Sequence, residues 1–292
     1  MGAPNTEAIV PRNLHFEFDE TLPAYWHSGN PAITSYYDAL SFTFPEGERF
    51  FIDSVKHYAD RITDPKLKRD VAAFTAQEAV HSREHIVYNK NVGRHGVNVK
   101  PIEAHIRFWM KLLRRLPPRS QLAITCALEH FTALFAEVTL GDPRTLADAH
   151  PFYRDLWHWH AMEEEEHKAV AFEVFRAVTP PVRFYVVRCI WMALMTLDFT
   201  LMTMILPAIL MVQRGEFFNL KAWAGAYWYH YVVPGNWPKV IWGVAKYFAP
   251  GFHPARRKVA PQVLAWRNYY RQTVKRAPSM PGSIFEGVPG GA

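Results

Sequence analysis

Apolar residues recur at spacings of three and four positions along much of the chain, which is the pattern of amphipathic α-helices. The pattern begins near residue 46, where Phe51, Val55 and Tyr58 share one helical face. The preceding stretch, residues 1–44, contains several prolines and little such periodicity, so we expect an irregular N-terminal arm. No strand-like alternation of useful length occurs, and the pattern therefore predicts an all-α protein.

Proline and glycine divide this helical pattern into segments. Asp64 followed by Pro65 is a typical helix start, because the carboxylate caps the first turn and proline fits its first position. The helices predicted in this way begin near residue 46 and then cover residues 64–90, 102–116, 119–140, 151–178 and 254–276. We expect a helical bundle over 45–180, accessory apolar and aromatic helices packed on it over 181–276, and a disordered tail over 277–292.

Two predicted helices each carry the motif Glu-x-x-His, at Glu78–His81 and at Glu164–His167. Positions i and i+3 lie on one face of a helix, so each pair can bind one metal ion. Single glutamates on two further helices, Glu48 and Glu129, precede the motifs by about one helix and a turn. Two Glu-x-x-His helices and two Glu helices are the ligand pattern of ferritin-like di-iron and di-manganese bundles. The spacing thus predicts a ferritin-like four-helix bundle with a di-metal centre.

The fourth of these helices offers a third histidine ligand. His160 lies one turn before Glu164 and shares its face, and His85 is the analogous candidate one turn after His81. Glu46 is the rival to Glu48, while the neighbours Glu163, Glu165 and Glu166 are expected on a solvated or salt-bridged face. The predicted metal ligands are Glu48, Glu78, His81, Glu129, His160, Glu164 and His167, and all except His160 are also predicted catalytic residues.

The composition narrows the chemistry further. The chain has only 2 cysteines, which excludes a disulfide framework and a four-thiolate zinc site and indicates a reducing, cytoplasmic location. Carboxylate and imidazole donors suit iron or manganese, so we expect two Fe, with Mn or a mixed Fe/Mn pair as the alternative. The net charge of +6 comes without a long basic run, and nucleic acid is not an expected partner.

An apolar stretch, residues 189–212, has one charged residue, Asp198, and is long enough to span a bilayer. Its threonines and Pro207 argue against a span, and a buried helix or a dimer interface is the favoured interpretation. An aromatic region with interspersed lysines follows, which also suits a membrane interface. We therefore expect a homodimer. Membrane association through 184–250 stays open as a second expectation, and it would make the protein peripheral to the membrane.

Three segments resemble a known family. Phe44-Pro-Glu-Gly-Glu48-Arg-Phe-Phe51, Gln77-Glu-Ala-Val-His81 and His160-x3-Glu-x2-His167 are similar to the bacterial family of predicted metal-dependent hydrolases, over most of residues 25–275. The last motif is also similar to the ligand pattern of arylamine N-oxygenases, which carry an additional histidine on the fourth helix. That second resemblance covers the ligands alone.

Three functions fit these residues. The first is a di-iron oxidase or oxygenase that activates O2 and oxidises a hydrophobic small molecule, with an electron donor that the sequence does not identify. The second is a metal-dependent hydrolase in which a hydroxide bound by two metal ions attacks the substrate, which requires no serine or cysteine nucleophile. The third is non-catalytic iron binding, for which the apolar extension after residue 180 is unneeded. We expect the first.

Overall fold

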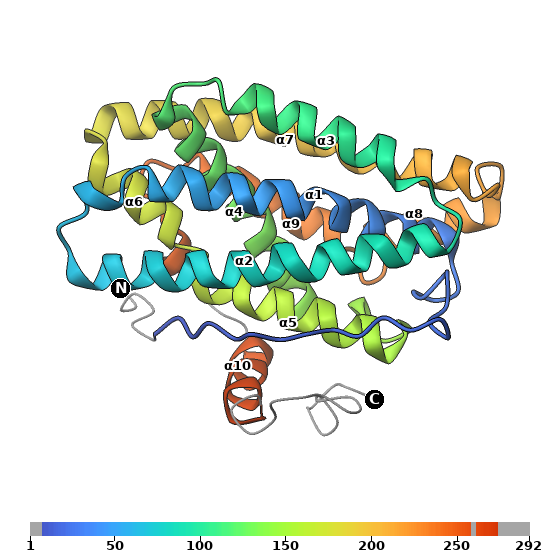
Figure 1. The fold of residues 1–292 in the computed structure, drawn as a ribbon. Helices are drawn as coiled ribbons and strands as arrows, with labels where there is room; N and C mark the ends of the chain where they lie inside the picture. The colour runs from blue at the N-terminus through green and yellow to red at the C-terminus, as the bar shows by residue number, and fades with distance from the viewer. Residues whose placement is uncertain (1–7, 258–260, 274–292) are drawn as a thin grey trace.

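The structure is a computed structural model that describes residues 8–257 and 261–273. Within these ranges the chain forms helices and no strand, apart from one isolated bridge between His27 and Ala149. The all-α prediction is confirmed. The helices are α1 (Pro31–Lys56), α2 (Pro65–Arg94), α3 (Val99–Leu113), α4 (Pro118–Gly141), α5 (Pro151–His167), α6 (Val170–Val178), α7 (Pro181–Gln213), α8 (Leu220–Tyr231), α9 (Asn236–Tyr247) and α10 (Pro261–Thr273) (Figure 1).

The first helix begins earlier than the sequence pattern predicts. The expected arm over 1–44 is wrong in its second part, because α1 starts at Pro31. Asn30 caps this helix, since its side chain accepts hydrogen bonds from the backbone N–H groups of Ala32 and Ile33. Side chains around almost the whole circumference of the first turns are buried, so no polar face marks the helical period.

The predicted helix over 151–178 is two helices. Helix α5 ends at His167 and α6 starts at Val170, with Lys168 and Ala169 between them. The break contains neither proline nor glycine, so the local sequence does not indicate it. It lies directly after the last predicted metal ligand.

Four helices lie around the buried carboxylates. Helix α1 packs along α2, and α4 packs along α5 (Figure 1). Helix α7 covers α1 and α4 from outside, with α9 on α4 and α8 on α1. The helices after residue 180 therefore pack on those that carry the predicted ligands. The assignment to the ferritin-like superfamily stays a prediction, and the tail expected over 277–292 lies outside the described residues.

Two of the described helices, α4 and α7, are long and apolar enough to cross a membrane by length and composition alone. In the most apolar window of α4, 72% of the residues are buried, so α4 is a core helix; in α7 only 33% are buried. The outer face of α7 exposes apolar side chains over most of its length, including Val186, Ile190, Leu194, Leu197, Leu201 and Ile205. A buried helix is thus the wrong interpretation for most of residues 189–212, whereas membrane association and a homodimer stay predictions.

Candidate metal centre

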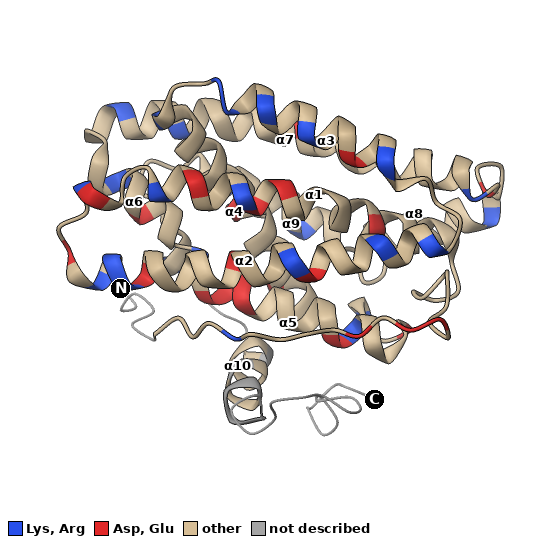
Figure 2. Cartoon of the chain, viewed as in Figure 1, with Lys and Arg blue, Asp and Glu red and all other residues tan. Residues whose placement is uncertain are grey.

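The seven predicted ligands lie together in the interior. Each exposes 3% of its surface or less. Helix α1 contributes Glu48, α2 contributes Glu78 and His81, α4 contributes Glu129, and α5 contributes His160, Glu164 and His167. Acidic positions on the middle of α2 and on the last turns of α5 accordingly lie close together (Figure 2). The helical spacing explains the convergence, because i, i+3 and i+4 positions share one face.

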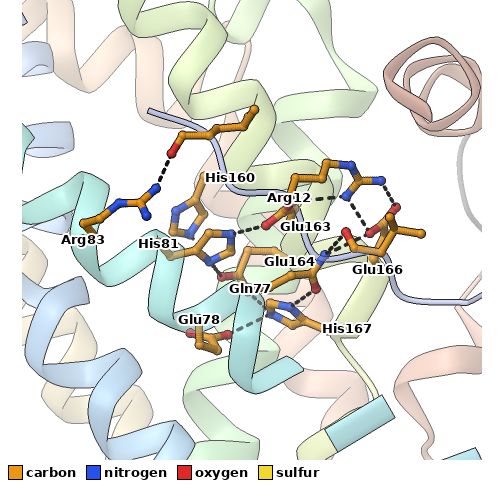
Figure 3. A network of polar contacts seen from close by, with 12 residues as sticks. Arg12, Gln77, Glu78, His81, Arg83, His160, Glu163, Glu164, Glu166 and His167 are labelled. Atoms are coloured by element: carbon orange, nitrogen blue, oxygen red, sulfur yellow. Dashed lines mark hydrogen bonds and ion pairs between the residues drawn. The ribbon is translucent and has the colours of Figure 1, made fainter. Parts of the chain in front are cut away.

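One imidazole nitrogen is close to three carboxylates. His167 Nε2 lies 3.0 Å from an oxygen of Glu78 and 3.3 Å from one of Glu164 (Figure 3). It also lies 3.5 Å from an oxygen of Glu129. A ring N–H donates well to one acceptor, not to three. Carboxylates at this separation repel one another unless a cation lies among them. The geometry around this nitrogen therefore suits a cation. Glu164 and Glu129 outweigh burial and hold the pKa of the His167 imidazole well above its usual value.

Several donor atoms of the cluster have no hydrogen-bond partner among the described residues. They include both carboxylate oxygens of Glu48, both of Glu129, and Nδ1 of His81. Polar atoms buried without a partner are costly and rare in native proteins, and a buried unpaired charge costs more. These side chains fit a metal ion, which would bind the same lone pairs that are otherwise unsatisfied.

The donors form overlapping groups of three whose ligand atoms all lie within 4.8 Å of one another. These groups are Glu48, Glu78 and His81; His81, His160 and Glu164; Glu78, Glu164 and His167; and Glu48, His85 and His160. Together they contain every predicted ligand except Glu129, which joins the cluster through its contact with His167. All ligand atoms are oxygen or nitrogen, the donor set that suits iron, manganese or zinc.

Each histidine of the cluster is oriented by a second residue behind it. His167 Nδ1 lies 3.1 Å from the side-chain oxygen of Gln77, so its N–H donates there and leaves Nε2 toward the carboxylates (Figure 3). His81 Nε2 lies 3.0 Å from Glu163 in the same way, which leaves Nδ1 toward the cluster. Such outer hydrogen bonds fix the tautomer and the ring angle of metal-binding histidines.

His85 has this outer role for the third histidine. Its Nε2 lies 2.9 Å from His160 Nδ1, and its own Nδ1 lies 2.8 Å from the hydroxyl of Ser41. His160 Nε2 consequently faces Glu164, at 3.1 Å. Helical spacing indicates His85 as a candidate ligand, and the structure places it within reach of the cluster and in contact with His160.

The acidic run on α5 is largely buried rather than solvated: Glu163, Glu164 and Glu165 are buried and Glu166 is partly buried. Arg12 of the N-terminal arm donates to Glu163 at 3.1 Å and to Glu166 at 2.9 Å, and Lys168 pairs with Glu165. The salt-bridged interpretation of these glutamates is correct and the solvated one is wrong. Arg12 lies about 150 residues away in the sequence, so no local pattern indicates the pairing.

Burial and mutual repulsion dominate the electrostatics of the cluster. Burial raises the pKa of Glu48 well above its usual range, and the carboxylates of Glu78, Glu164 and Glu129 raise it further. Burial likewise raises the pKa of Glu129. For Glu164 the neighbouring imidazoles outweigh burial and hold its pKa well below normal. Strong shifts in opposite directions within one cluster are typical of a functional site.

A cavity borders the cluster. Its near end is formed by His160, Glu164 and Thr132, and the Thr132 hydroxyl donates a hydrogen bond to Glu164. Apolar and aromatic side chains of α1, α4, α5 and α7 form most of its wall, among them Leu40, Phe44, Phe135, Trp157 and Phe199. A small molecule bound there would lie beside the carboxylate–imidazole cluster.

Comparison with known proteins supports a metal-dependent role. The chain matches the family model described as predicted metal-dependent hydrolase over residues 10–258. This range includes all the helices that contribute to the cluster and to the cavity wall. No curated protein and no solved structure matches the chain.

Proposed function

The chain belongs to the family of predicted metal-dependent hydrolases, and on that premise we propose that it is a two-metal hydrolase acting on a hydrophobic small molecule. The observation that carries the proposal is the set of buried, unpartnered carboxylate oxygens beside histidines whose tautomers are fixed from outside. A cluster of this kind is costly without cations.

The number of donors supports two ions rather than one. Four carboxylates and three imidazoles offer more donor atoms than one tetrahedral or octahedral ion can use. We assign the ligand role to Glu48, Glu78, His81, Glu129, His160, Glu164 and His167. When bound, such ions polarise the bond to be cleaved and lower the pKa of a water molecule at the site.

The protein's own residues position the substrate and protect the site. The Thr132 hydroxyl donates to Glu164 and so fixes the carboxylate that faces the cavity. Gln77 and Glu163 hold the rings of His167 and His81. The aromatic wall excludes bulk water from the cavity, which strengthens every electrostatic interaction inside it.

A second candidate function is the oxidation of a hydrophobic molecule by O2 with two Fe ions, or with Mn or a mixed pair. The third imidazole, His160, and the apolar cavity beside it favour this function. The family description favours hydrolysis. Both candidates require the same seven ligands, so they differ in metal and reaction rather than in site.

One experiment on the full chain separates the two. We would load the protein anaerobically with Fe(II), add O2 and record optical spectra, and in parallel assay zinc- and manganese-loaded protein against aryl esters and anilides. Hydrolysis predicts cleavage that disappears in His167→Ala, together with no optical response to O2. An O2-dependent optical change without cleavage would overturn hydrolysis in favour of oxidation.

A further inference from the structure

The cavity beside the metal centre has a second polar end, formed by Tyr36 and His230. Tyr36 lies about 18 Å along α1 from the proposed ligand Glu48. We propose that the cavity binds a neutral molecule with an apolar body and one hydrogen-bonding group, which His230 and Tyr36 hold at this far end. The inference deepens the proposed function and rests on it, because it places the opposite end of that molecule at His160 and Glu164.

The body of the cavity selects for apolar ligands. Phe44 of α1, Phe135 of α4, Trp157 of α5 and Phe199 of α7 contribute aromatic side chains from four different helices. No lysine or arginine lines the cavity within the described part of the chain. A ligand that fills this space is desolvated, so a phosphate or sulfonate in its middle would lack a counter-charge.

The far end contains two buried polar atoms that the protein does not satisfy. His230 of α8 exposes 8% of its surface and Tyr36 of α1 exposes 6%. His230 Nε2 has no hydrogen-bond partner among the described residues, and the Tyr36 hydroxyl interacts with the Trp237 side chain without a hydrogen bond of normal geometry. Their rings lie 4.2 Å apart, and both residues line the cavity. Two unsatisfied polar atoms at one place indicate a hydrogen-bonding ligand group.

Both groups are uncharged near neutral pH. Burial lowers the pKa of His230 to about 3. Burial also raises the pKa of the Tyr36 phenol well above its usual value. A neutral imidazole and a neutral phenol can each donate or accept one hydrogen bond, but neither compensates a negative charge. The group they recognise is therefore a hydroxyl, carbonyl or amide rather than a carboxylate.

The test is direct binding, measured by calorimetry on the full chain. The probes are 4-phenyl-1-butanol and 4-phenylbutanoate, which share an apolar body and differ in one end group. We expect the alcohol to bind and the carboxylate to bind at least about tenfold more weakly. His230→Phe keeps the ring but removes the nitrogen, and it should weaken alcohol binding about fivefold.

Matched variants test the location. Ala136 lines the cavity and is buried, so Ala136→Trp should abolish binding, whereas Ala245→Trp on the exposed side of α9 should leave it unchanged. If Ala136→Trp does not fold, as judged by circular dichroism, His230→Phe alone decides. Equal affinity for both probes, or unchanged alcohol binding in His230→Phe, would overturn the proposal.

The same measurement on Glu129→Gln separates this inference from the proposed function. Glu129 does not line the cavity, so alcohol binding should persist in this variant even if its metal content falls. If Glu129→Gln still binds the alcohol and keeps its full metal content, the result contradicts the assignment of Glu129 as a metal ligand and leaves the cavity inference intact. Metal loss in Glu129→Gln, combined with no alcohol binding in the unmodified chain, contradicts the cavity inference alone.

Discussion

Gln77 links the N-terminal arm to the metal centre, and replacing it should weaken metal binding without removing a ligand. Its side-chain oxygen accepts from His167 Nδ1 at 3.1 Å, and its amide donates to Glu166 at 3.0 Å and to the carbonyl of Val10 at 3.2 Å. The side chain is fully buried. Leucine has a similar volume, so Gln77→Leu removes three hydrogen bonds and leaves His167 Nδ1 unpaired.

The structure sets the size of the effect. A neutral hydrogen bond contributes about 1 kcal/mol, and one to a carboxylate such as Glu166 contributes about 1.5–3 kcal/mol. With two neutral bonds and one to Glu166 lost, we expect the free energy of unfolding to fall by about 3–5 kcal/mol. Loss of a residue that orients a metal-binding histidine typically lowers metal affinity about 10–100-fold.

The assay is a competition titration with a chromophoric chelator, together with urea unfolding. Gln121→Leu is the matched control, because Gln121 also donates to two carbonyls, those of Arg114 and Leu116, at the start of α4 away from the cluster. The control should lose stability and keep its metal affinity. If Gln77→Leu binds metal as tightly as the unmodified chain does, Gln77 does not orient His167 for metal binding.

Two further predictions concern pH and the surface. Burial lowers the pKa of His27 to about 4, so the unfolded chain binds a proton at this residue below pH 6.5 that the folded chain excludes. The contribution of His27 to the unfolding free energy, measured in chelator, should therefore fall by about 3 kcal/mol between pH 6.5 and 4. This slope should be shallower in His27→Asn, and an unchanged slope would contradict the assignment. The exposed apolar face of α7 should bind the chain to anionic vesicles, and Leu197→Asp combined with Leu201→Asp should abolish co-sedimentation. The alternative is a protein interface on α7. It would be shown if the unmodified chain does not bind vesicles but forms a dimer, and if the double variant is monomeric.

The candidate site was predictable because its chemistry follows the helical period. Two Glu-x-x-His motifs place their side chains on one face whatever the rest of the chain does, and His160 follows from the same geometry. The outer partners were not predictable in the same way. Arg12 reaches Glu163 and Glu166 from a segment without regular structure, and such long-range contacts have no signature in the local sequence.

The start of α1 shows the corresponding limit for the fold. A helix whose sides are all buried has no alternation of polar and apolar faces, so residues 31–44 resemble an irregular segment. The capping residue Asn30 followed by Pro31 was the available signal for a helix start. For α7, composition indicates a long apolar helix, but only its packing on α1 and α4 shows which face stays exposed.

The central claim is that four carboxylates and three imidazoles bind a pair of metal ions. Its most direct test is elemental analysis of the purified full chain and of His167→Ala, with circular dichroism on both. The account predicts about two ions per chain, and loss of metal from the variant while most of its helical signal remains. A metal-free chain that cannot be loaded, or unchanged metal content in His167→Ala, would contradict it.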